Sequence, residues 1–227
     1  MENVNSLNDM LSSQDAGDRR NACESLGDSR SCDSVPLLAS MLADVDPGVR
    51  EAALNALTAI GGRKVAEAAA PLLKSESAML RNMGVEILEL IGAEAFPVIA
   101  GLLNDNDDDV VKFGVDIIAH CREERAIGLL SALVGHANPN VRASVAVCLG
   151  RLKAASAGPL LLRALEDPEE WVRFSAVEGL GLIHDRRALS PLLKLIEVDS
   201  GLIKDAAIDA AGRIAPAEDA SMILLKL

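Results

Sequence analysis

Aromatic side chains are scarce in this chain of 227 residues, which contains no tyrosine, one tryptophan and three phenylalanines. Half of the residues are nevertheless hydrophobic, so alanine and leucine must supply most of the packing. Sandwiches and barrels favour β-branched and aromatic residues, whereas closely packed helices accommodate alanine and leucine well. The composition therefore favours an all-α fold.

Long apolar runs and a signal peptide are also lacking. No run approaches the roughly 20 residues that a membrane-spanning helix needs. The first ten residues, MENVNSLNDM, lack the basic and apolar regions of a signal peptide. No CxxC motif occurs, and three of the four cysteines fall inside predicted helices, where cysteine packs as a small apolar residue. We therefore expect a cytoplasmic protein with reduced thiols and no membrane partner.

Positive charge is in deficit, since the formal net charge is −12 and the sequence pI is about 4.7. An acidic surface repels phosphate backbones, which disfavours nucleic acid as a partner. A basic protein or peptide is easier to accommodate.

Residues that carry chemistry are few and scattered. The three histidines, His120, His136 and His184, lie too far apart in sequence to form paired metal ligands. Neither GxxxxGK[ST] nor GxSxG occurs, and GLGLI at Gly179 lies in a predicted helix, where its glycines favour close helix packing. The acidic run NDNDDDV at residues 104–110 lacks the glycine and distal glutamate of a calcium loop. We expect no catalytic residues, no cofactor and no metal.

The chain repeats itself about every 31 residues. VREAALNALTAIG at Val49 has counterparts throughout the chain, for example VRASVAVCLGRL at Val141 and VRFSAVEGLGLI at Val172. The second residue of each copy, named here the ladder position, recurs at intervals of 31 residues, with one interval of 30: Arg19, Arg50, Arg81, Val111, Arg142, Arg173 and Lys204. A second motif, such as VPLLASML at Val35 or GPLLLRAL at Gly158, lies between the copies. Each unit is therefore predicted to be two short helices.

Proline and glycine mark the predicted helix ends. Asp46-Pro47, Asn138-Pro139 and Asp167-Pro168 each predict an N-cap followed by a helix-starting proline. Gly61, Gly92 and Gly150 lie near the ends of second helices, where a left-handed residue can close them, although Gly150 is also placed to let helices pack closely. Pro71 lies later in its unit than the other prolines and is expected to kink or shorten its helix.

These motifs resemble the HEAT repeat, in the short variety named after phycobilisome lyases. The residues that carry the resemblance are the PLL of the first helix, the D-P-x-V-R start and the small-Leu-Gly-x-Ile of the second helix. The resemblance implies a right-handed α-α superhelix, with second helices on its concave side. We expect residues 1–227 to form one solenoid of seven repeats plus a final unpaired helix at 218–227. That apolar end predicts either continuation into a longer solenoid or self-association.

One face of the second helices is predicted to line a groove. Five residues after the ladder position lies a mostly acidic row: Glu24, Asn55, Glu86, Asp116, Val147, Glu178 and Asp209. Stacking would place neighbours about 10 Å apart. The row is either a solvated face or a track for a basic segment. Beside it we expect apolar and polar groove residues, although the two phenylalanines could instead be core: Met83, Leu90, Phe113, Trp171, Phe174, Leu182, His120, Arg151 and Arg213.

The ladder arginines are predicted to be structural. Arg50, Arg81, Arg142 and Arg173 should pair with acids near helix starts of adjoining repeats, and Val111 should interrupt this ladder.

The sequence thus favours a non-enzymatic scaffold or adaptor that binds a protein or peptide with a basic segment. Two alternatives stay open. One is a bilin-lyase-like protein that handles a chromophore, for which more groove arginine or histidine would be expected. The other is a regulatory segment of a larger multidomain protein.

Overall fold

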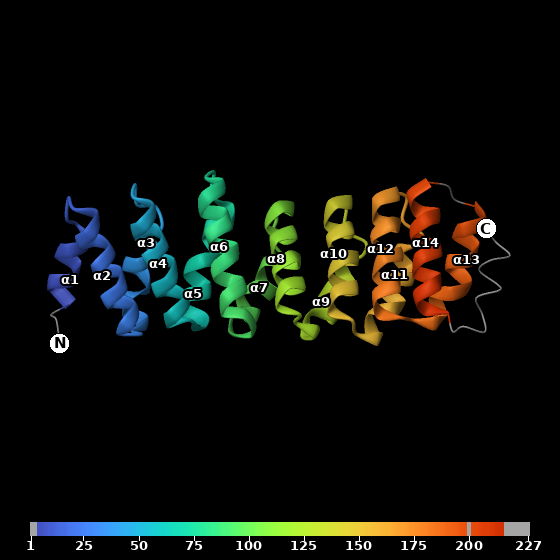
Figure 1. Ribbon diagram of the computed structural model, residues 1–227, viewed down its shortest axis with the longest axis horizontal. Helices are drawn as coiled ribbons and strands as arrows, with labels where there is room; N and C mark the ends of the chain where they lie inside the picture. The colour runs from blue at the N-terminus through green and yellow to red at the C-terminus, as the bar shows by residue number, and fades with distance from the viewer. Residues whose placement is uncertain (1–3, 199–200, 216–227) are drawn as a thin grey trace. The chain divides into compact units, whose positions relative to one another are not determined.

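A computed structural model describes residues 4–198 and 201–215, and within these ranges the chain forms helices and no strands (Figure 1). The predicted final helix at 218–227 lies outside them. The chain divides into two compact units, residues 1–102 and 103–227. In the described part, no helix has the length and hydropathy that crossing a membrane requires.

The first unit stacks helical hairpins. Each hairpin pairs an odd-numbered first helix with an even-numbered second helix, and α2, α4 and α6 pack in that order. The helices are α1 (Val4–Leu11), α2 (Ala16–Asp28), α3 (Val35–Met41), α4 (Pro47–Ile60), α5 (Gly62–Ala69), α6 (Ala78–Ile91) and α7 (Phe96–Leu102).

The second unit is built in the same way, with α8, α10, α12 and α14 packed side by side (Figure 1). Its helices are α8 (Asp108–Cys121), α9 (Ile127–Leu133), α10 (Pro139–Leu152), α11 (Gly158–Ala164), α12 (Glu170–Ile183), α13 (Leu189–Val198) and α14 (Gly201–Ile214).

The starts of the second helices follow the sequence repeat. They lie 31 residues apart, with one interval of 30, at Ala16, Pro47, Ala78, Asp108, Pro139, Glu170 and Gly201. Apolar residues at helical spacing turn one stripe of each helix inward. In α12 this stripe is Val172, Ala176 and Leu180, all completely buried. Since one hairpin cannot cover both of its stripes, the neighbouring hairpin completes each core.

Caps explain where these helices begin. Asp46 accepts hydrogen bonds from the N–H groups of Gly48 and Val49, and Asn138 accepts one from Asn140, so both predicted caps are confirmed. The prediction for Asp167-Pro168 is wrong, because α12 begins at Glu170 and Glu169 holds the N-cap position. The N-caps of the second helices recur at the interval of the repeat, and Asp167 lies two residues before the position that this interval gives.

Pro71 shortens its α-helix. α5 ends at Ala69, and the chain continues as a 3₁₀ turn, Ala70–Lys74, with Pro71 in its first positions. A proline there lacks the N–H group that would continue the α-helical ladder, which accounts for the change of pitch.

Close helix packing depends on glycine at particular points. Gly150 lies inside α10, which supports the packing role among its two predicted roles. A Cβ atom at Gly150 would lie 2.6 Å from the Cα atom of Gly179 in α12. Likewise, a Cβ atom at Gly181 would meet Ala210 of α14 at 3.2 Å. Both glycines of the GLGLI motif therefore lie where the helices of the second unit approach each other.

The ends of second helices offer a stability test in the first unit. Arg30 follows α2 with a left-handed φ of 49°, and Gly61 ends α4 with φ 64° and ψ −166°. We expect Arg30→Gly to raise the free energy of unfolding by about 0.5–1 kcal/mol, because glycine adopts this φ without steric cost. Gly61→Ala should lower it by about 1–3 kcal/mol, because its backbone region is essentially restricted to glycine. Urea unfolding followed by circular dichroism measures both, and a destabilised Arg30→Gly would contradict the assignment.

The cysteines differ in access to solvent. Cys23 and Cys148 are buried, Cys32 is exposed and Cys121 is half-buried. Burial raises the pKa of the Cys23 thiol to about 11 and that of Cys148 to about 12. An unfolded thiol ionises near pH 8.5, so the fold is stabilised by keeping these two thiols protonated. This contribution to the free energy of unfolding should be lost as the pH rises from about 9 through the folded pKa values.

Thiol labelling tests this burial. Maleimide at pH 7 should modify Cys32 first, whereas Cys23 and Cys148 should react only as fast as the fold opens. Mass spectrometry of peptides after timed quenching gives the order of labelling, with a urea-unfolded sample as the control. Native labelling of Cys148 at the rate of Cys32 would contradict the structure.

Candidate functional site

The ladder arginines hold the turns of their own hairpins. The Arg50 Nη1 atom donates to the carbonyl oxygens of Asp44 at 2.7 Å and Val45 at 3.0 Å. Arg81 bonds in the same way to the carbonyl oxygens five and six residues before it, as do Arg142 and Arg173. These four side chains therefore secure the connection between first and second helices.

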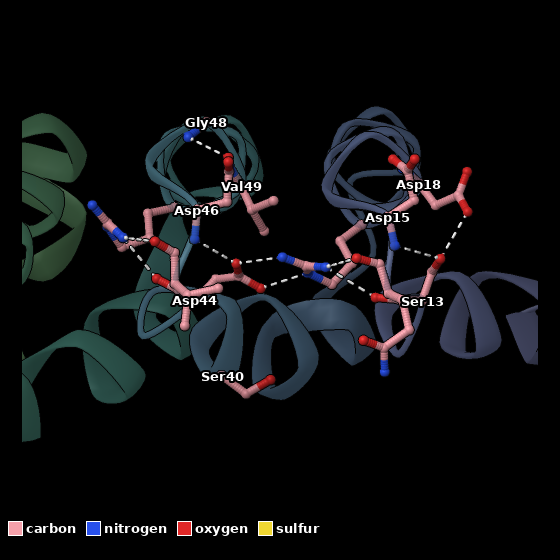
Figure 2. A network of polar contacts seen from close by, with 12 residues as sticks. Ser13, Asp15, Asp18, Ser40, Asp44, Asp46, Gly48 and Val49 are labelled. Carbon is pink, nitrogen blue, oxygen red and sulfur yellow. Dashed lines mark hydrogen bonds and ion pairs between the residues drawn. The ribbon is translucent and has the colours of Figure 1, made fainter.

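At two places, an aspartate connects neighbouring hairpins by accepting hydrogen bonds from the ladder arginine of the preceding hairpin. The Asp44 carboxylate accepts two bonds of 2.8 Å from Arg19 and one from the N–H of Asp46, while its carbonyl accepts from Arg50 (Figure 2). Asp167 repeats the arrangement in the second unit, with bonds of 2.7 and 2.8 Å from Arg142. In both cases the arginine keeps the pKa of the carboxyl below its usual value.

Sequence reasoning omitted Arg19 from the structural ladder. The signal that could have found it is an aspartate 25 residues after the ladder position, which occurs for Arg19 and Arg142. The corresponding residue is Ser75 for Arg50 and Asn106 for Arg81. At the interrupted position, Val111 is buried and the corresponding residue is His136.

In the first unit, Glu24 on α2 and Asn55 on α4 are exposed, and the other predicted groove residues lie on α6. Glu86 is exposed and Met83 is half-buried. Leu90, four residues after Glu86, is 62% exposed. This face of α6 therefore combines an acid with accessible apolar side chains.

In the second unit, the acidic row is partly neutralised by the chain itself. Lys112 lies 2.6 Å from Asp116 on α8. On α14, Arg213 pairs with Asp209 and also reaches the Oε2 atom of Glu178 on α12, at 3.9 Å. The row is thus a line of acids with interspersed cations.

An apolar pocket of about 250 Å³ opens between the N-terminal parts of α12 and α14. Its lining residues are Glu170, Trp171, Phe174, Leu202 and Ile203. Trp171 is 47% exposed, Phe174 is 37% exposed and Leu202 is 71% exposed. Phe113 is half-buried on α8 and lies two second helices away from α12.

Sequence reasoning identified Trp171 and Phe174 but missed Leu202 and Ile203. Trp171 and Leu202 lie 31 residues apart, so they occupy the same repeat position on adjacent second helices. The available signal was a large apolar residue in two consecutive copies, two residues before the ladder position.

The described residues hold no group of three or more histidine, cysteine, aspartate or glutamate side chains that could bind a metal ion. What the pocket and its surroundings can do is bind: an apolar hollow takes an apolar side chain, and the nearby carboxylates take a cation.

The sequence model for HEAT repeats matches residues 4–89, 97–174, 126–212 and 159–227. No curated protein sequence matches the chain.

Solved structures share the fold at low identity. A chain from the structure of Kap95p binding to RanGDP has a TM-score of 0.58 at 16% identity, covering 94% of this chain and 34% of that one. YibA from Escherichia coli has a TM-score of 0.54 at 22% identity, covering 99% and 87%. A designed armadillo repeat protein in complex with the peptide (KR)4 has a TM-score of 0.51 at 20% identity, covering 80% and 99%.

The all-α repeat fold expected from the motifs is confirmed by the helices, by the repeat-family match along the chain and by these structural relatives. The chain belongs to the HEAT-repeat family.

Proposed function

We propose that this protein is a non-enzymatic binding module that holds a protein or peptide segment on the exposed face of its second helices. The observation that carries the proposal is the pocket between α12 and α14. Three large apolar side chains, Trp171, Phe174 and Leu202, gather there with much of their surface in water.

Much of the surface of this cluster lies outside the core of its own unit. The fully buried stripe of α12 consists of other residues, Val172, Ala176 and Leu180. Covering exposed apolar surface contributes about 25 cal/mol per Å², and tryptophan is enriched among residues that dominate interface affinity. The pocket is therefore the favoured anchor for a partner.

The charge of the protein supports a basic partner segment. The chain carries −12 overall, and Glu170 lines the pocket itself. Two fold relatives have a named partner, RanGDP for one and the peptide (KR)4 for the other. They show that related helical repeats accommodate protein and peptide partners, while the choice of a basic segment here rests on this chain's own acids.

The bilin-lyase-like alternative gains nothing from the pocket. An acidic tetrapyrrole calls for cations, and the titratable residue in the lining is Glu170. We therefore do not propose a chromophore site there.

Selection from a phage-displayed library of random dodecapeptides tests the proposal. Peptides recovered on wild type should bind the double variant Trp171→Ala/Leu202→Ala at least about tenfold more weakly, the loss typical of removing interface anchors. Leu129→Ala is the matched control, because Leu129 is 40% exposed on the first helix α9. Circular dichroism checks that each variant is folded.

Equal binding to the folded double variant would reject the pocket as the binding site. A separate variant carrying Glu86→Lys and Phe113→Ala tests the other predicted groove residues. Weaker binding to this second variant would extend the site beyond α12 and α14.

A further inference from the structure

We infer that Arg213 occupies, in the free protein, the position that a basic side chain of the partner takes in the complex. This inference rests on the proposed function and names the chemistry of the partner: a large apolar residue with an arginine or lysine two or three residues away.

The guanidinium of Arg213 lies between two carboxylates from adjacent second helices, Asp209 on α14 and Glu178 on α12. Two acids share one cation, so the group keeps one net negative charge. A guanidinium held this way marks where a second cation would be attracted.

The side chains of Arg213, Glu178 and Asp209 are accessible to water, at 38%, 39% and 57% exposed. Ion pairs this open to water are weak, because solvent screens them. A partner cation can therefore displace the guanidinium of Arg213 at small cost.

The carboxylates of Glu178 and Asp209 lie close to the pocket along their helices. Phe174 precedes Glu178 by four residues on α12, and Leu202 precedes Asp209 by seven on α14. With a rise of 1.5 Å per residue, these separations are about 6 Å and about 10 Å along the helices. An extended peptide advances about 3.3 Å per residue, so two or three residues connect the pocket to the carboxylates.

The exposed face that α12 and α14 share is acidic. On α14, Asp205 lies between Leu202 and Asp209 at helical spacing and is exposed. The face thus presents the acids Glu170, Glu178, Asp205 and Asp209 together with Arg213 as its cation. Removing that cation should raise the affinity of the face for a basic segment.

The experiment repeats the dodecapeptide selection on wild type and on Arg213→Gln. Arg63→Gln is the matched control, because Arg63 also pairs with an acid four residues away, Glu67, but lies on the first helix α5. It removes the same charge and releases a carboxylate away from the exposed face of the second helices. Each recovered peptide is measured by fluorescence anisotropy, alongside a version with its basic residues replaced by glutamine.

The expected result is a recovered pattern of one large apolar residue followed or preceded by arginine or lysine at two or three residues. Arg213→Gln should bind such peptides about two- to fivefold more tightly than wild type, and Arg63→Gln should bind them as wild type does. The gain should shrink in high salt, because the carboxylates are exposed. The glutamine version of each peptide should show no gain.

Two results would overturn the inference in distinguishable ways. If peptides bind through Trp171 but Arg213→Gln and Arg63→Gln behave alike, the role of Arg213 is rejected and the proposed function stands. If no peptide recovered on any of the proteins depends on Trp171, the proposed function fails, and the inference fails with it.

Discussion

Gly150→Ala is expected to lower the free energy of unfolding by about 1–3 kcal/mol, as inserting an atom into a packed contact typically does. The added Cβ atom would lie 2.6 Å from the Cα atom of Gly179, so the backbones of α10 and α12 would have to separate. The direction is informative, because replacing glycine by alanine inside a helix ordinarily stabilises it by about 0.5–1 kcal/mol.

Gly212 provides the matched control within the same unit. It lies inside α14, and a Cβ atom there has open space around it. Gly212→Ala should therefore raise stability by about 0.5–1 kcal/mol, the ordinary helix effect. Urea unfolding curves of both variants decide the matter. A stabilised Gly150→Ala would mean that α10 and α12 are farther apart than the structure places them.

Asp167→Ala is expected to cost about 2 kcal/mol at pH 7, because it strips two charge-assisted bonds from Arg142. The side chains of Asp167 and Arg142 are 7% and 12% exposed, so water replaces those bonds poorly. The neighbouring Glu166 is exposed, and Glu166→Ala should change stability by less than about 0.5 kcal/mol. Chemical unfolding of both variants against wild type measures the difference.

The pH dependence of this effect has a defined direction. The side-chain bond from Arg142 is the main cause that holds the pKa of Asp167 below its usual value. The contribution of the Asp167 carboxylate to stability is therefore present above the unfolded aspartate pKa of about 3.9. It is lost as the pH falls through the lower folded pKa. Wild type and Asp167→Ala should converge in stability below about pH 4. A constant difference down to pH 3 would show that the carboxylate charge is not what stabilises the native state.

The candidate site was only partly predictable from the sequence. Trp171, Phe174, Glu178 and Asp209 were expected on the exposed face of the second helices, because helical spacing places them away from the buried stripe. Leu202 completes the pocket from the next repeat, and its pairing with Trp171 depends on how α14 packs against α12. Arg213 was expected only as a polar residue of the same face, and its bridge to Glu178 depends on the same packing.

The sequence by itself determined the helical hairpins, the helix starts at Asp46 and Asn138, and the stripe of each second helix that turns inward. These properties follow from a helical period of 3.6 residues, from local caps such as Asp46 and from the recurrence of the unit every 31 residues. Tertiary structure alone decided which side chains meet: Asp167 with Arg142, Arg213 with Glu178, and Trp171 with Leu202. Such contacts depend on the distance and register between neighbouring helices, which are set by packing at points such as Gly150 and Gly179.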